Sequence, residues 1–109
     1  MQVLKFGGSS VKNAENINKV IAIVNEKKQQ GTTIVVVSAL GGITDILLQC
    51  CKLASEGNES YRDKLLESEQ RHLQTVKELL PITQQSRVLS LVKTLCNEIE
   101  DICTGIFLL

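Results

Sequence analysis

A lysine, two glycines and two serines near the start of the chain have the chemistry to bind a phosphate group. Lys5 belongs to a short apolar segment, and Gly7, Gly8, Ser9 and Ser10 follow it almost at once. The lysine supplies positive charge, and a glycine-rich turn ahead of a helix exposes backbone N–H groups that attract anions. The Walker lysine follows its glycines and the Rossmann motif needs three spaced glycines, so neither common nucleotide motif is present. The segment predicts a phosphate site of another kind.

A second loop, Ser-Ala-Leu-Gly-Gly at residues 38–42, has a similar composition. Ser38 and Ala39 open this loop, and Thr44 and Asp45 follow it where a helix is expected to begin. An aspartate in the first turn complements the positive end of the helix dipole. Two glycine loops with hydroxyl groups therefore precede two helices.

The elements that must position these loops form a βαβ unit. Residues 2–6 predict a buried strand, and residues 14–30 predict a helix that ends at Gly31. Residues 32–38 are β-branched and apolar, which is typical of a central parallel strand covered on both faces. Both loops would then leave the carboxyl edge of one parallel sheet, where open α/β sheets bind ligands.

Each of these features also has a plain structural explanation. Lys5 could cap a strand end in solvent, and the glycine pair of the first loop could form a tight turn without a ligand. Ser38 could satisfy local backbone groups, and Thr44 could serve only to begin a helix. The prediction of a site depends on the convergence of the two loops.

The remaining residues predict three helices. The first spans 43–55, the second spans 60–80 with Ser60 as its N-cap, and the third spans 84–105 with Thr83 as its N-cap. Apolar residues of the third helix alternate between steps of four and three: Val88, Val92, Leu95, Ile99, Ile102 and Ile106. This spacing suits a coiled coil, but we favour two antiparallel helices packed on each other.

The predicted fold class is α/β, with a βαβα unit over residues 1–58 and a helical hairpin over 59–109. With 109 residues, the chain is long enough for one small domain. The 12 basic residues equal the 12 acidic ones, which argues against nucleic acid or an anionic membrane as a partner. We expect a cytoplasmic protein, because the sequence has no apolar run that resembles a membrane span or signal peptide.

The four cysteines do not follow a zinc-binding pattern, since they contain no C-x-x-C pair and only His72 accompanies them. We interpret the adjacent Cys50 and Cys51 as small hydrophobic residues of a helix in a reducing compartment. His72 lies within an amphipathic helical pattern, and we do not expect it to be catalytic. No metal site is predicted.

Two segments resemble a known family. Lys-Phe-Gly-Gly-Ser-Ser-Val at 5–11 and Val-Val-Ser-Ala-Leu-Gly-Gly-Ile-Thr-Asp at 36–45 are similar to the start of the aspartokinases, within the amino acid kinase family. Residues 104–109 resemble the longer aspartokinases, including those fused to homoserine dehydrogenase. The resemblance covers the whole chain and implies a parallel-sheet sandwich. The implied reaction is transfer of the γ-phosphoryl group of ATP to the β-carboxylate of L-aspartate, which gives aspartyl-4-phosphate for lysine, threonine and methionine biosynthesis.

The resemblance also implies roles for individual residues. Lys5 would be catalytic and contact the transferring phosphoryl group, while Gly7, Gly8 and Ser9 would cradle the phosphates of ATP. Position 9 is more often threonine in the family, and serine keeps the hydroxyl group.

The acceptor side is implied in the same way. Ser38, Ala39 and Thr44 would bind aspartate. ATP would act as co-substrate with the Mg²⁺ that it carries, and the protein would form a homo-oligomer.

The resemblance implies a kinase domain more than twice this long, so we expect the chain to be an N-terminal fragment. The alternatives are another family member that phosphorylates acetylglutamate, glutamate, carbamate or a nucleoside monophosphate, and a non-enzymatic helical interaction module. The hydroxyl groups of the loop at 38–44 favour aspartate as the acceptor.

Overall fold

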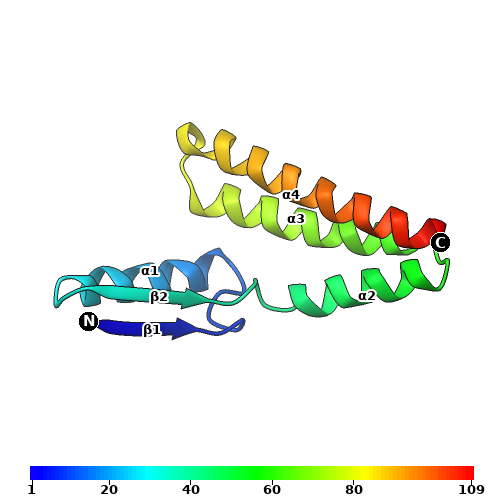
Figure 1. Ribbon diagram of the computed structural model, residues 1–109. Helices are drawn as coiled ribbons and strands as arrows, with labels where there is room; N and C mark the ends of the chain where they lie inside the picture. The colour runs from blue at the N-terminus through cyan, green and yellow to red at the C-terminus, as the bar shows by residue number, and fades with distance from the viewer. The chain divides into compact units, whose positions relative to one another are not determined.

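The computed structural model describes all 109 residues and divides them into two compact units, residues 1–42 and residues 43–109. The first unit contains strand β1 (Gln2–Phe6), helix α1 (Ala14–Lys28) and strand β2 (Thr33–Val37) (Figure 1). The second contains helices α2 (Ile43–Ser55), α3 (Tyr61–Leu79) and α4 (Ile82–Leu108). This confirms the α/β class and every predicted element.

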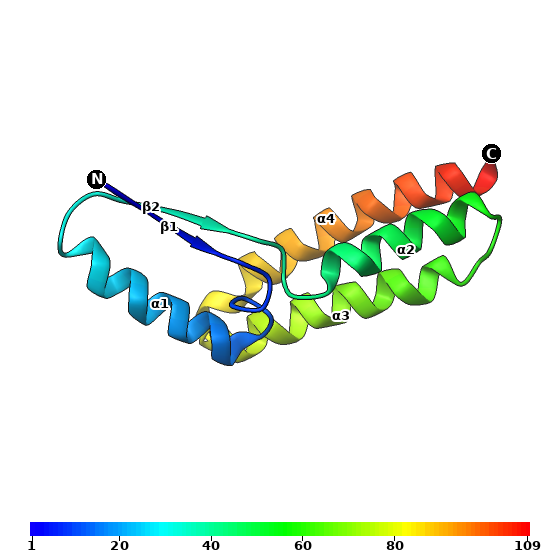
Figure 2. The ribbon, with the colours of Figure 1, turned by 90° about the horizontal axis from the view of Figure 1, so that it is seen from below.

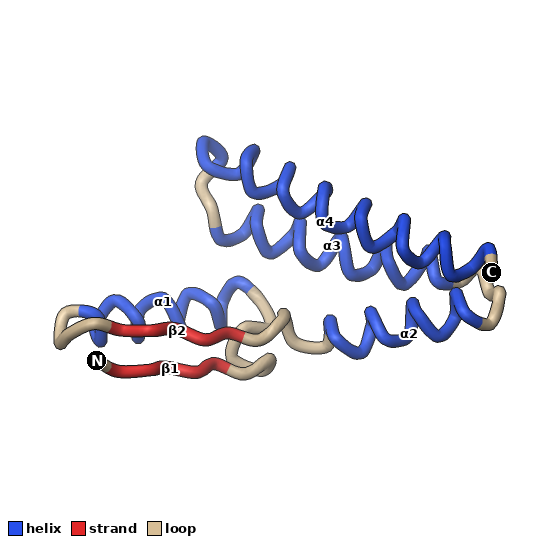
Figure 3. The backbone as a smooth tube through the Cα atoms, viewed as in Figure 1, coloured by secondary structure: helices blue, strands red, loops and turns tan.

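The two strands of the first unit are parallel, and Gln2 pairs with Thr33 at one end and Phe6 with Val37 at the other (Figure 3). Helix α1 makes the connection between them. The Gln2 side-chain amide donates to the Lys27 carbonyl oxygen at 2.7 Å and to Thr33 Oγ1 at 3.0 Å, which ties both strands to the end of α1.

Helix α1 begins and ends with clear local signals. The Asn13 side chain accepts a hydrogen bond from the Asn16 N–H, so Asn13 is a true N-cap. The helix ends at Lys28, two residues earlier than predicted. Gly31 then adopts a φ of +150°, which favours glycine.

The prediction that β2 is covered on both faces is wrong for this chain. Ile34, Val35, Val36 and Val37 are each between 40% and 59% exposed. Only two strands and one crossover helix are present in the unit, so α1 can cover one face and β2 has one hydrogen-bonded neighbour. The continuous apolar run of β2 is therefore left partly open to solvent.

The three helices of the second unit pack on one another, and α2 contacts both α3 and α4 (Figure 2). Because α2 packs with these helices, the boundary between the two compact units falls after Gly42. Helix α2 ends at Ser55, and Gly57 beyond it has a φ of +70°, while the Asn58 N–H donates to the Leu53 carbonyl at 2.9 Å. This is the Schellman arrangement that satisfies the last carbonyls of a helix.

Two predicted caps are wrong. Ser60 precedes α3 but has helical dihedral angles and makes no side-chain cap bond; instead the Asn58 side chain accepts from the Ser60 N–H at 2.9 Å. Thr83 lies inside the first turn of α4, because Pro81 occupies the N-cap position in an extended conformation.

The antiparallel arrangement of α3 and α4 is confirmed, but the predicted apolar seam is only partly correct. Leu95 is 49% exposed and Ile102 is 62% exposed, whereas Cys103 is buried. A straight α-helix has 3.6 residues per turn, so its buried face drifts away from a strict seven-residue spacing. Cys103, one residue beyond Ile102, occupies the buried position in its place.

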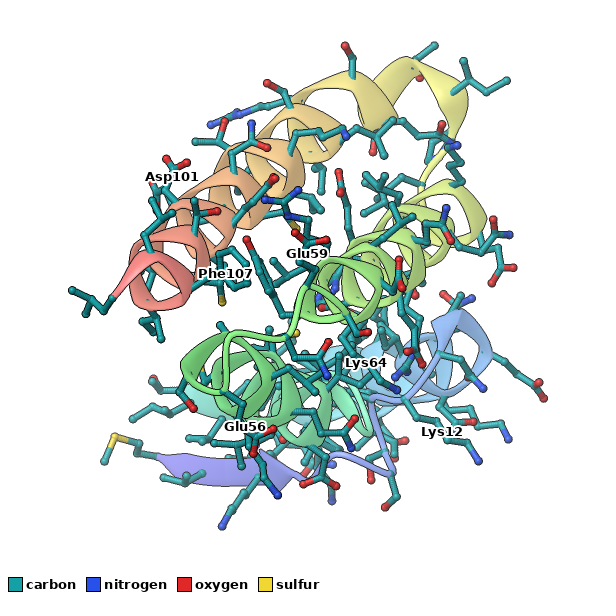
Figure 4. The ribbon with its side chains drawn as sticks, turned by 90° about the vertical axis from the view of Figure 1, so that its right-hand side faces the viewer. Lys12, Glu56, Glu59, Lys64, Asp101 and Phe107 are labelled. Atoms are coloured by element: carbon teal, nitrogen blue, oxygen red, sulfur yellow. The ribbon has the colours of Figure 1, made fainter.

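A tyrosine network closes the core of the second unit. Tyr61 is fully buried, its hydroxyl group shares a hydrogen bond with Thr104 Oγ1 at 3.2 Å, and Arg62 Nε donates to it at 3.2 Å. These bonds lower the pKa of Tyr61, the bond with Thr104 most. Phe107 points from α4 toward α3, and its ring centroid lies 5.5 Å from that of Tyr61 (Figure 4). The network fixes the end of α4 against the start of α3.

Candidate functional site

Lys5 lies on the face of the sheet opposite α1. Alternate residues of β1 differ in burial, with Gln2, Leu4 and Phe6 half-buried and Val3 and Lys5 exposed. Because strand side chains alternate between faces and Gln2 bonds to α1, the odd-numbered residues point away from that helix. The lysine is the last but one residue of β1, so its charge stands beside the loop that follows.

The loop after β1 leaves three consecutive backbone N–H groups available. The Ser10 N–H donates to the Gly7 carbonyl at 3.0 Å and the Val11 N–H donates to the Gly8 carbonyl at 3.3 Å. No hydrogen bond within the first unit takes up the N–H groups of Gly7, Gly8 and Ser9. Free N–H groups in a row form the kind of concave donor set that holds an anion.

The rest of this loop is anchored. The Asn16 side chain donates to the Ser9 carbonyl at 2.9 Å, and Val11 is buried. Helix α1 begins only at Ala14, and Asn13 already caps it. The donors therefore come from the loop itself, and not from the helix end that the sequence suggested.

The second loop meets the first directly, as predicted. The Ser38 N–H donates to the Phe6 carbonyl at 3.1 Å, which extends the strand pairing to the edge. A Cβ atom placed on Gly8 would lie 3.6 Å from both Gly41 Cα and Ser38 Oγ. A Cβ atom placed on Gly41 would lie only 2.8 Å from the Gly8 carbonyl oxygen, so the two backbones are in contact.

The joined loops carry positive and no negative side chains. Residues 5–13 include Lys5 and Lys12, and neither these residues nor residues 38–42 include Asp or Glu. Lys12 was not singled out from the sequence, yet its Cβ atom is the other close neighbour of Gly41. A basic residue in the same loop was the signal that could have drawn attention to it.

The structure brings together six of the seven predicted site residues. They lie on β1, its loop or the loop after β2: Lys5, Gly7, Gly8, Ser9, Ser38 and Ala39. Thr44 is exposed in the first turn of α2 and belongs to the second unit. The roles of these residues in binding or catalysis stay predictions.

Other polar groups have structural partners. His72 Nδ1 lies 2.7 Å from the Ser68 carbonyl oxygen of its own helix, and Lys93 forms an ion pair with Glu69 between α4 and α3. The hydrogen bond with Glu69 raises the pKa of Lys93. No group of three or more His, Cys, Asp or Glu side chains is placed to hold a metal ion. None of the helices has both the length and the apolar character needed to cross a membrane.

Comparison with known proteins gives one family. Residues 1–102 match the amino acid kinase family. The chain is 39% identical over 77 residues to an aspartokinase of Chlamydia trachomatis, which covers 71% of the chain and 16% of that protein. It is 38% identical over 104 residues to an aspartokinase of Chlamydia pneumoniae, covering 92% of the chain and 22% of the relative.

A fused enzyme is also similar. The bifunctional aspartokinase/homoserine dehydrogenase of Buchnera aphidicola is 31% identical over 112 residues, which cover all of the chain and 14% of the relative. The chain thus spans less than a quarter of the length of each of these relatives.

Proposed function

The chain belongs to the amino acid kinase family, and from this we propose that it supplies the phosphoryl-binding part of an ATP-dependent aspartate kinase. The relatives named aspartokinase support a kinase, and the choice of aspartate as acceptor is our inference from them. The observation that carries the proposal is the row of free N–H groups at Gly7, Gly8 and Ser9, next to Lys5 and joined to the second glycine loop.

Phosphoryl transfer makes demands that this arrangement suits. Negative charge is spread over three equatorial oxygens of the transferring group, and catalysis consists mostly of positioning and charge stabilisation. The amides of Gly7, Gly8 and Ser9 would hold phosphate oxygens without needing to reorganise. Lys5 would place its positive charge beside the transferring group and stabilise the negative charge on the phosphoryl oxygens. The Mg²⁺ would come with ATP as part of the co-substrate.

The acceptor would bind on the side of the second loop. Ser38 and Thr44 offer hydroxyl donors for the carboxylates of aspartate, and Ala39 would line the same side. Ser38 already lies beside Gly8 in the structure, so an acceptor held there would be close to the phosphate loop. Holding the acceptor and the phosphoryl group side by side would convert a bimolecular reaction into an effectively unimolecular one, and this accounts for a large part of catalysis.

A graft tests the proposal. Residues 1–109 would replace the matching segment of the Chlamydia pneumoniae aspartokinase, which aligns with 92% of the chain. Acyl phosphate formed from ATP and aspartate would be trapped with hydroxylamine, and glutamate and acetylglutamate would be offered in parallel. We expect a folded, ATP-binding chimera that phosphorylates aspartate in preference to the other acceptors.

Two substitutions in the chimera separate the roles. Lys5→Ala should lower kcat about 10²–10³-fold, or about 3–4 kcal/mol, because the charge acts mainly in the transition state. Lys28→Ala in the last turn of α1 is the control and should leave kcat unchanged. Thr44→Val should raise the KM for aspartate and leave the KM for ATP nearly unchanged. A normal kcat for Lys5→Ala, or equal weakening of both substrates by Thr44→Val, would contradict the assignment.

A further inference from the structure

The outer edge of β2 has unpaired backbone groups. On its inner edge, the Gln2 N–H donates to the Thr32 carbonyl at 2.9 Å, and β1 is the one strand beside β2. At the other end of the pair, the Ser38 N–H donates to the Phe6 carbonyl at 3.1 Å. Alternate residues of a strand in a parallel pair turn both backbone groups to the same neighbour, so the even-numbered residues of β2 bond to β1. The residues whose N–H and C=O groups point outward are Thr33, Val35 and Val37.

The same residues direct their side chains toward α1. The register pairs Phe6 with Val37, and paired residues of parallel strands share a face. Val35 and Val37 are 40% and 59% exposed and line one side of an apolar groove of about 460 Å³, and residues of α1 such as Ile21 line the other side. No residue of β1 and no charged residue lines this groove. The groove therefore lies beside the outer edge of β2 and suits an uncharged strand.

We propose that β2 pairs with β2 of a second copy of this chain, in an antiparallel register centred on Val35. Val35 exchanges both backbone hydrogen bonds with Val35 of the second copy, and Thr33 of each copy does the same with Val37 of the other. The two-stranded sheets of the copies become one sheet of four strands. The inference does not depend on the proposed kinase function, because it uses only β2 and the groove beside it.

The chemistry of β2 favours its own copy as the occupant. The strand is uncharged, and its apolar residues are all β-branched, which suits a pleated, half-buried surface. Its outward-pointing residues are spaced symmetrically about Val35, so a two-fold axis there pairs the same groups on both copies and closes the dimer. The 12 basic and 12 acidic residues of the chain balance, so net charge does not oppose association.

The size of the contact indicates a weak dimer. From the exposure of Val35, Val37 and Ile21, pairing covers roughly 400 Å² per copy, about half of the 800 Å² per partner that is typical of stable complexes. About six backbone hydrogen bonds form between the copies in this register. We expect a dissociation constant on the order of 100 μM.

Amide hydrogen exchange of the 109-residue chain at rising concentration tests the proposal. The N–H groups of Ile34 and Val36 donate to β1, so they should be protected equally at every concentration and serve as the internal control. The outward N–H groups of Thr33, Val35 and Val37 should exchange about fourfold more slowly at about 1 mM than at about 10 μM, as a dissociation constant near 100 μM requires.

NMR of a mixture of isotope-labelled and unlabelled chains tests the register. In the antiparallel pairing centred on Val35, Ile34 lies directly opposite Val36 of the second copy, and their Hα atoms are in close contact. We expect a nuclear Overhauser effect between these two Hα atoms across the copies. A parallel pairing would not bring them together.

Two variants of Val35 separate the backbone from the side chain. Val35→Pro removes an outward N–H, which an edge strand tolerates, and should weaken the dimer at least about tenfold because two hydrogen bonds are lost. Val35→Ile is the matched control, since it keeps the N–H and adds one methylene to the apolar groove, and it should remain dimeric. Protection of the Ile34 and Val36 amides checks that β2 still pairs with β1 in each variant.

Several results would overturn the proposal. Association that leaves the amides of Val35 and Val37 as exposed as in the dilute chain would show that another surface holds the copies together. A monomer at about 1 mM, growth into open-ended assemblies, or the absence of the Ile34–Val36 contact between the copies would each contradict the closed antiparallel pair. The unaltered chain gives these results by itself, so they stand even if Val35→Pro fails to fold.

Discussion

Replacing Gly41 by alanine tests whether the two glycine loops truly touch. The added Cβ atom would lie 2.8 Å from the Gly8 carbonyl oxygen and 2.8 Å from Lys12 Cβ. The Lys12 side chain can turn aside, but the Gly8 carbonyl belongs to the backbone, so the two loops must separate. Overpacking of this kind costs about 1–3 kcal/mol. Gly7→Ala is the matched control, because a Cβ atom at Gly7 has no neighbour within 4 Å.

Amide hydrogen exchange measures the loss of stability in the first unit itself. The amides of β1 and β2 report opening of the first unit, whereas the circular dichroism of the chain is dominated by the helices of the second. For Gly41→Ala we expect the opening equilibrium of β1 and β2 to rise about 5- to 150-fold, which corresponds to 1–3 kcal/mol. Gly7→Ala should change it by less than about threefold. Equal protection in the two variants would show that the loops do not meet.

Three further predictions concern stability and association. Gly105→Ala should stabilise the second unit by about 1 kcal/mol in urea unfolding, because Gly105 lies within α4 with open space around it, and no change would contradict this. Burial raises the pKa of Cys50 from 9.0 to about 11, so the folded state holds that proton more tightly and stability should fall by about 1–3 kcal/mol as pH rises through this window. Cys50→Ala should make the fall shallower, and an identical pH profile would refute the cause. The chain should self-associate through the open face of β2 at Ile34 and Val36, and sedimentation as a folded monomer at high micromolar concentration would contradict this.

Elements with strong local patterns could be predicted from the sequence. The strand at 2–6 and the helix that begins near Ile43 follow apolar periodicity, and Gly57 ends that helix as glycine does at many helix ends. The caps at Ser60 and Thr83 could not be predicted by residue type alone. A hydroxyl group caps a helix only when its own residue has an extended backbone. Before α3, Ser60 is helical and the Asn58 side chain accepts from its N–H; before α4, Pro81 takes the extended N-cap position and Thr83 lies inside the helix.

The tertiary arrangement was harder to predict. Leu95 and Ile102 fit a seven-residue spacing, but the helix turns at its own period and buries Cys103 instead. The apolar run of β2 shows that the strand suits burial on both faces, and it carries no information on how much of a sheet is present to provide that burial.

Only part of the candidate site could be predicted, because topology fixes where the loops meet but not the turns that they adopt. Parallel strands send their following loops to one edge, so the convergence of Gly8 with Ser38 followed from topology. The free N–H groups depend on which turns the loop adopts, and composition does not determine this. The close approach of Gly41 to Lys12 needed the packing of both loops.

The most direct test is a titration of the isotopically labelled chain with inorganic phosphate, in which the backbone amide resonances are monitored by NMR. The phosphate titration tests only whether the first loop binds an anion, and a titration with chloride at equal ionic strength controls for charge screening. We expect saturable shifts that are largest at Gly7, Gly8 and Ser9, with the affinity reduced in Lys5→Ala and unchanged in Lys28→Ala. Shifts of equal size in chloride, or shifts that spare these three amides, would contradict the claim that this loop binds the phosphoryl group.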